Sequence, residues 1–133
     1  MFLYLLNKEE QENFLELAFY AIELDNVGKE QETKILESYK YECQLIDYKI
    51  KKQDSIENVI DSLKLSIKKT KKIILLEFIG ILLADGSISQ EEAIFLDKLS
   101  LELGIENYEV KKIKRWVEAM NDIVKEGYSI ISK

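Results

Sequence analysis

Apolar residues recur every three or four positions along most of this chain, a spacing typical of helices that bury one face. Residues 73–84 depart from that pattern, since they are apolar except for Glu77 and Gly80. A helix that is apolar on all sides is either buried among other helices or inserted in a membrane. This segment is too short to cross a hydrocarbon layer, which needs about 20 residues. We therefore expect a buried central helix with other helices around it.

Gly80 interrupts this central helix, where a glycine costs roughly 1 kcal/mol relative to alanine. Two explanations are open. The glycine either lets a neighbouring element approach closely, or marks a functional kink, and the first is favoured.

Amphipathic segments on both sides predict an all-α domain of about six helices. The chain contains no proline, which favours long unbroken helices, and its length fits one domain. Side chains that can cap a helix N-terminus mark the expected starts, at Asn7, at Asp54 or Ser55, at Ser89 and at Asn107. Glycines mark two expected helix ends, Gly104 and Gly127. The expected helices around the centre are about 7–24, 30–44, 55–64, 90–103 and 107–126.

An internal repeat divides the chain. A shift of sixty residues aligns residues 15–52 with 75–112 without a gap, and keeps the hydrophobic positions in register. Asp25 then meets Asp85, so the same turn recurs in both halves. A fixed period of this kind indicates duplication. We expect two similar, interlocked units around one core in a single domain, 1–133, at about residues 14–66 and 74–126.

The turn after the central helix has two interpretations. Asp85-Gly86 is a turn signal, and Ser89 with Glu92 has the spacing of a capping box. The same stretch matches the second half of a calcium-binding loop, but Ile81 and Leu83 occupy the first two acidic ligand positions. A tight calcium site needs about six to eight oxygen ligands. A turn followed by a helix cap is therefore favoured over a weak cation contact or a tight calcium site.

The amino-acid composition excludes several common catalytic mechanisms. The chain has no histidine, which excludes a Ser-His-Asp triad and imidazole metal ligands. Its single cysteine, Cys43, lies in a helical pattern and is expected in the core rather than as a nucleophile. We expect no enzymatic activity. The first six residues are too short for a signal peptide and lack its basic flank, which predicts a cytoplasmic protein.

Charge is unevenly distributed. Residues 1–47 carry eleven acids and four bases, residues 48–72 three acids and eight bases, and residues 73–133 eleven acids and seven bases. The basic block in the middle includes Lys68 and Lys72. A solvated lysine face is the favoured interpretation. A pI near 4.9 and the scarcity of aromatic residues in the basic segments argue against nucleic-acid binding.

The repeat places a second basic cluster next to the only tryptophan. Trp116 is either a core anchor or an exposed contact for a partner. We take the tryptophan and the preceding cluster as candidates for binding a protein partner. These residues are Lys111, Lys112, Lys114, Arg115 and Trp116.

A DG turn followed by a helix that begins with paired glutamates, in duplicate, resembles the TerB-like (tellurite-resistance) family. The resemblance covers about residues 7–125. It is strongest from Leu76-Glu77-Phe78 through Ala84-Asp85-Gly86 to Glu91-Glu92. Relatives include the N-terminal helical domain of a membrane-anchored J-domain co-chaperone. The resemblance implies a compact helical fold and an association with tellurite resistance, stress responses and phage defence. No enzymatic activity is established for the class.

The family also implies a metal role for the acidic turns. The first repeat departs from the pattern, because Asn26 replaces the turn glycine and Lys29 replaces the capping serine. The positions to which the suggested metal contacts transfer are Asp85, Glu91, Glu92, Asp25 and Glu32.

Three functions follow from these patterns. The favoured one is a non-enzymatic interaction module that binds a protein partner in a stress-, tellurite- or phage-related system. The alternative is a metal- or oxyanion-responsive protein with a weak divalent-cation site at the acidic turns and no other cofactor. An enzyme would need a carboxylate pair and is disfavoured. We expect no membrane span, and the sequence leaves the oligomeric state open.

Overall fold

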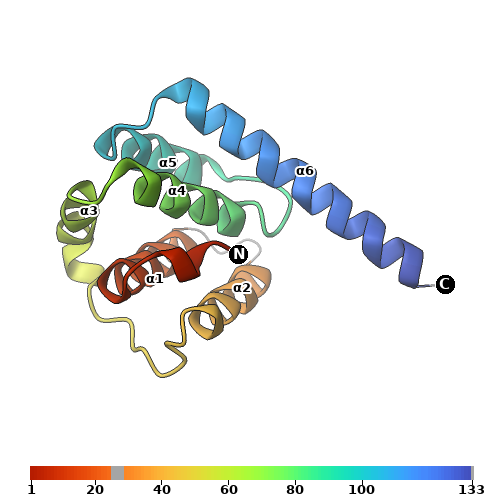
Figure 1. Ribbon diagram of the computed structural model, residues 1–133, viewed down its shortest axis with the longest axis horizontal. Coiled ribbons are helices and arrows are strands. Elements are labelled where there is room, and N and C mark those ends of the chain that lie inside the picture. The colour runs from red at the N-terminus through yellow and green to blue at the C-terminus, as the bar shows by residue number, and fades with distance from the viewer. Residues whose placement is uncertain (25–28, 133) are drawn as a thin grey trace.

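Within residues 1–24 and 29–132, which the computed structural model describes, the chain forms six α-helices, two short 3₁₀ helices and no strand (Figure 1). The expected all-α fold of about six helices is confirmed. The 3₁₀ helices are η1 (Leu3–Leu5) and η2 (Gln53–Ser55). The α-helices are α1 (Lys8–Glu23), α2 (Lys29–Glu42), α3 (Ile56–Lys64), α4 (Lys68–Leu82), α5 (Gln90–Glu102) and α6 (Asn107–Ile131).

The apolar helix α4 lies at the centre and contacts α1, α2, α5, α6 and η1. Its prediction as a buried helix is confirmed, although it begins at Lys68 rather than Ile73. No helix in the described part of the chain combines the length and the hydrophobicity needed to span a bilayer. The α4 side chains with no exposed surface are Ile74, Leu75, Phe78, Ile79, Ile81 and Leu82.

Gly80 of α4 lies where a side chain of α2 approaches closely. A Cβ atom at this position would lie 3.1 Å from the hydroxyl oxygen of Tyr39. That hydroxyl donates a hydrogen bond of 3.0 Å to the backbone carbonyl of Glu77. The close-approach explanation for Gly80 is therefore confirmed.

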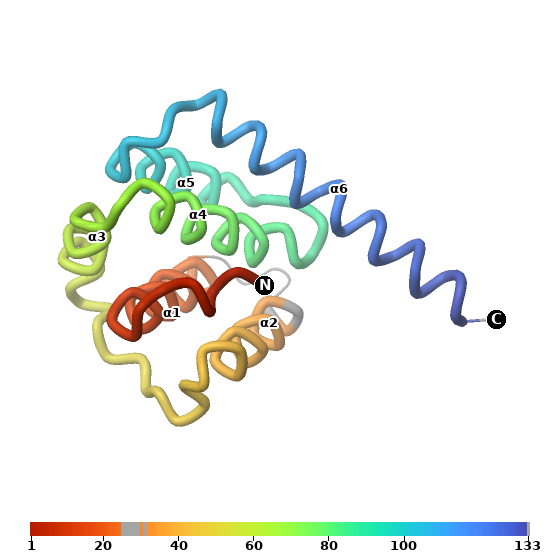
Figure 2. Tube along the Cα trace, viewed as in Figure 1, coloured from red at the N-terminus to blue at the C-terminus, as the bar shows by residue number. Residues whose placement is uncertain are grey.

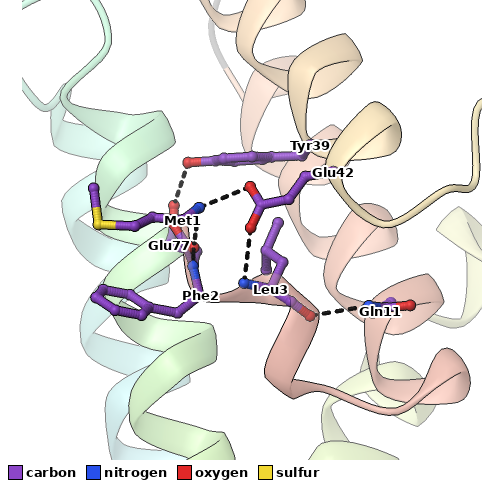
Figure 3. A network of polar contacts seen from close by, with 7 residues as sticks. All are labelled: Met1, Phe2, Leu3, Gln11, Tyr39, Glu42 and Glu77. Atoms are coloured by element: carbon purple, nitrogen blue, oxygen red, sulfur yellow. Dashed lines mark hydrogen bonds and ion pairs between the residues drawn. The ribbon is translucent and has the colours of Figure 1, made fainter.

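Glu77, the other exception in α4, binds the N-terminal segment (Figure 3). The Met1 ammonium group donates to the carboxylates of Glu77, at 3.0 Å, and Glu42, at 2.7 Å. The backbone N–H groups of Phe2 and Leu3 donate to Glu77 and Glu42 respectively, at 2.7 and 3.0 Å. Burial works against the charge of Met1, but the two carboxylates outweigh it and raise the pKa of the ammonium group.

The two halves share their first two helices and differ in the third. Shifted by sixty residues, α1 covers 68–83 and α2 covers 89–102, which agree with α4 and α5 to within one residue. In the same way, α1 contacts α2 and α3, while α4 contacts α5 and α6. However, α3 begins at Ile56, whereas α6 begins at Asn107, nine positions earlier in the aligned half. The duplication itself stays a prediction.

Helix α6 is longer than expected, and its C-terminal half extends beyond the other helices (Figure 2). The prediction that Gly127 ends the helix is wrong, because one interior glycine costs only about 1 kcal/mol and no proline follows it. The predicted Asn107 cap is also wrong. The N-cap residue is Glu106, whose side chain makes no capping hydrogen bond.

Two of the other predicted caps form, and one does not. Asn7 and Ser89 each make a complete capping box, with Glu10 and Glu92 respectively. The prediction of a side-chain cap on α3 is wrong, because η2 leads directly into this helix and the Ser55 hydroxyl donates instead to a backbone carbonyl. Gly104 follows α5 with φ +70°, as expected of a residue that ends a helix.

A buried carboxylate of α1 holds the segment between α2 and α3. Glu16 has no exposed surface and accepts hydrogen bonds from the backbone N–H groups of Lys51 and Lys52, at 3.0 and 2.9 Å. The Tyr48 hydroxyl and the Gln53 amide also donate to it. Burial alone would raise the pKa of the Glu16 carboxyl, but these hydrogen bonds outweigh it and lower the pKa.

Replacing Leu82 with alanine tests the role of α4 as the core. Leu82 is fully buried, so Leu82→Ala should lower the free energy of unfolding by roughly 2–5 kcal/mol in urea denaturation. Leu101→Ala is the matched control, because Leu101 is 81% exposed and its loss should change stability by less than about 0.5 kcal/mol. Equal unfolding midpoints for the two variants would contradict this assignment.

The hydrogen bonds that the Glu16 carboxylate accepts make the free energy of unfolding depend on pH. Because the folded-state pKa is lowered, ionised Glu16 stabilises the fold above its unfolded-state pKa of about 4.3. This contribution is lost as the pH falls through the folded-state pKa. Glu16→Gln should cost roughly 1–3 kcal/mol at pH 7, and the difference from wild type should shrink below about pH 4.

Asp97→Asn, which neutralises an exposed acid of α5, is the control for the pH series. Its unfolding free energy should follow that of the wild type within about 0.5 kcal/mol at pH 7. A Glu16→Gln cost that stays constant between pH 7 and pH 3 would show that the carboxylate charge contributes nothing.

Candidate functional site

A surface groove of 670 Å³ lies between α4, the N-terminal segment and the first half of α6. We call it the Trp116 groove. Its walls combine apolar and basic side chains from segments that are distant in the sequence. The lining residues are Phe2, Lys68, Lys72, Leu76, Tyr108, Glu109, Lys112, Ile113 and Trp116.

The aromatic wall of the groove is only partly covered. Trp116 is 43% exposed, and its ring lies against Phe2 with a centroid distance of 6.1 Å and an interplanar angle of 45°. Leu76 and Ile113, which are half-buried, add aliphatic surface. Trp116 is therefore neither a fully buried anchor nor an isolated surface ring. Partly exposed aromatic clusters of this kind are enriched at protein interfaces.

The basic side of the groove is held in place by one acid. The Glu109 carboxylate lies 3.3 Å from the ammonium groups of both Lys68 and Lys72, so it ties α6 to the first turns of α4. Burial of the Glu109 carboxyl would raise its pKa, but the two lysines outweigh it and lower the pKa. Lys112 adds a further positive charge to the lining, so the groove carries a net positive charge.

The structure separates the five predicted partner-binding residues. All five are exposed on α6, but only Lys112 and Trp116 line the groove. Lys111, Lys114 and Arg115 lie on other sides of the helix, because consecutive residues are 100° apart around a helix axis.

Groove residues from outside α6 were not predicted as part of a site. The sequence assigns Lys68 and Lys72 to a basic block without a role, and gives no role to Phe2. Phe2 reaches the groove because Glu77 and Glu42 hold the N-terminal segment against α4. The one signal in the sequence is the charge of Glu77 in an otherwise apolar helix, which requires a buried partner.

The acidic turn after α4 is used in local hydrogen bonds. Asp85 is exposed, and its carboxylate accepts from the backbone N–H of Ser87 at 3.3 Å. In the capping box, the Ser89 N–H donates to the Glu92 carboxylate at 2.9 Å, and the Glu92 N–H donates to the Ser89 hydroxyl at 3.1 Å. The positive φ of Gly86, +97°, completes the turn.

The other predicted metal contacts differ in solvent exposure. Glu91 is exposed, whereas Glu32 and Glu92 are 1% and 2% exposed. Asp25 lies outside the described residues. Among the residues that the structure does describe, no group of three or more acidic or cysteine side chains is placed to hold a metal ion.

The single cysteine lies in the core. Burial raises the pKa of the Cys43 thiol to about 11, so the thiol is protonated at neutral pH. The Trp116 groove combines apolar surface with positive charge, and the thiol is not part of its lining.

Comparison of the chain with protein-family models, with curated proteins and with solved structures found no match.

Two substitutions distinguish a helix cap from a cation site at the turn. If Ser89 and Glu92 form a cap, Ser89→Ala should cost about 0.5–2 kcal/mol and Glu92→Gln less. Both costs should be the same in EDTA and in millimolar calcium or magnesium, measured by urea denaturation. Ser87→Ala, an exposed serine in the same turn, is the control and should be neutral. A Glu92→Gln cost that appears only with a divalent cation would identify a metal ligand instead.

Proposed function

We propose that this chain is a non-enzymatic protein-interaction module whose Trp116 groove binds an amphipathic helix with acidic flanks. The observation that carries the proposal is the half-exposed Trp116–Phe2 pair beside a rim of lysines. Apolar side chains of the bound helix would cover the rings. Its acidic side chains would face Lys112 and the lysine pair at Glu109.

The two parts of the groove have different roles in this proposal. Burying one aliphatic side chain of a partner contributes about 1.5–3 kcal/mol, so contact with the rings supplies most of the affinity. Exposed charge pairs contribute less to affinity but orient the partner and speed association. An acidic helix is favoured over a basic one because the lining has three lysines and one glutamate.

The Asp85-Gly86 turn and the paired glutamates Glu91 and Glu92 support a TerB-like module, in the stress-, tellurite- or phage-related setting that the resemblance implies. A metal-responsive role is less favoured, because the Glu92 carboxylate already accepts the Ser89 N–H.

The only tryptophan of the chain reports directly on occupancy of the groove. The probe is a synthetic amphipathic helix with a leucine stripe and glutamates on its polar face, and the control peptide has lysines there. The acidic peptide should shift the Trp116 emission to shorter wavelength and saturate. The basic peptide should bind at least about tenfold more weakly, equivalent to about 1.4 kcal/mol.

A matched pair of variants locates the binding. Lys112→Glu should weaken the acidic peptide about tenfold, whereas Lys111→Glu, the same charge change outside the groove, should have little effect. Rising salt should weaken the interaction because the charges are exposed. Equal affinities for the two peptides, or no spectral change with either, would contradict the proposal.

A further inference from the structure

We propose that the helix bound in the Trp116 groove is the C-terminal half of α6 from a second copy of this chain. Two copies then form an antiparallel α6–α6 dimer in which each fills the groove of the other. This inference rests on the proposed function of the groove and names its partner.

The C-terminal half of α6 carries an apolar face that is largely exposed within the described residues. Beyond Val117, which is 1% exposed, the apolar residues continue at helical spacing. The C-terminal end of this helix projects beyond the other helices (Figure 2). The exposed fractions are 68% for Ile123, 71% for Ile130 and 75% for Ile131. Val124 and Tyr128, which are 48% and 65% exposed, lie toward another side of the helix and line a hollow beside Gly80 and Leu83.

The internal repeat gives independent evidence that this face is built to be covered. In the first half, the buried residues of α3 are Ile56, Val59, Ile60 and Leu63, with exposures of 8% or less. The sixty-residue shift places Trp116, Ala119, Met120 and Ile123 at these positions. The α3 face packs against α1, whereas its counterpart on α6 is exposed at Ala119 and Ile123 and only partly covered at Trp116 and Met120.

No steric contact within one copy requires a glycine at position 127. A Cβ atom at this position would meet no atom within 4 Å, in contrast to Gly80 beside Tyr39. An interior glycine destabilises a helix relative to alanine, so its presence on the apolar face is explained by the close approach of another helix.

Charge selects an antiparallel second copy. Residues 107–117 of α6 carry one acid and four bases, and residues 118–131 carry three acids and one base. An antiparallel pair places opposite charges side by side, whereas a parallel pair places like charges together. The acidic C-terminal half also disfavours an anionic membrane surface, which attracts helices with a basic polar face.

One register satisfies all of these features. A two-fold axis between Asn121 and Asp122 places Trp116 opposite Gly127 of the second copy, the largest side chain beside the smallest. The same axis pairs Ile113 with Ile130 of the second copy. The aliphatic residues of the projecting half then enter the groove.

The register also places opposite charges together at the edge of the contact. Arg115 lies near Glu126 of the second copy, and both are exposed on the same side of α6. Within one helix these two residues are about 16 Å apart along the axis, at about 1.5 Å per residue. They therefore meet only between copies.

Sedimentation equilibrium of the full chain tests the dimer. The wild type should be a dimer with a concentration-dependent dissociation constant that rises with salt. Arg115→Glu and Glu126→Arg should each raise the dissociation constant at least about tenfold, because each creates two like-charge contacts. Mixing the two variants should restore dimerisation, since both contacts are then complementary. Lys125→Glu, on the opposite side of the helix, should change it less than about twofold.

Gly127→Leu separates the dimer contact from folding. The single copy has space for this side chain, so the variant should keep its helix content and monomer stability while the dissociation constant rises at least about tenfold. A wild type that stays monomeric at high micromolar concentration would overturn the inference. A dimer that is indifferent to Arg115→Glu and Gly127→Leu, or a monomer that binds anionic vesicles through α6, would also overturn it. In each of these cases the acidic-peptide titration still decides the proposed function separately.

Discussion

The fold depends on one constraint, which is that residues 73–82 of α4 are almost entirely apolar and must be covered by other elements. Four helices and the N-terminal 3₁₀ helix contact it. Within residues 73–82, the two positions that interrupt the apolar pattern lie where the chain makes specific contacts. Gly80 admits the Tyr39 ring, and Glu77 binds the first residues. The exceptions to the pattern therefore fix which elements approach α4, and where.

The same contacts connect the core with the candidate binding surface. Glu42 of α2 and Glu77 of α4 hold the backbone of Met1 to Leu3, and this places the Phe2 ring against Trp116. The groove is thus assembled from the N-terminus, α4 and α6. Its shape is supported by the buried carboxylate of Glu77 and the half-buried carboxylate of Glu42.

Local features of this fold were predictable from the sequence, and non-local ones were not. The central helix and the Asn7 and Ser89 caps follow from residues close together in the chain. The prediction that a side chain of Asp54 or Ser55 caps α3 was wrong because a 3₁₀ helix precedes α3. Trp116 and Lys112 were identified as candidates, but Phe2 was not, since its position depends on carboxylates distant in the sequence.

One position of the predicted repeat differs in a way that matches the difference between the two halves. In the first half, Glu16 binds the N–H groups of Lys51 and Lys52, and holds this segment out of helical conformation. The chain bends there, and α3 folds back onto α1.

In the second half, the residue aligned with Glu16 is Leu76, which has no carboxylate to bind free N–H groups. The segment aligned with 51–52 is therefore free to hydrogen-bond within a helix, and α6 runs straight through residues 111–112. A straight α6 carries outward the apolar face that α3 buries in the first half. Leu76 instead lines the groove, so the substitution that keeps α6 straight also supplies part of the surface proposed to receive it.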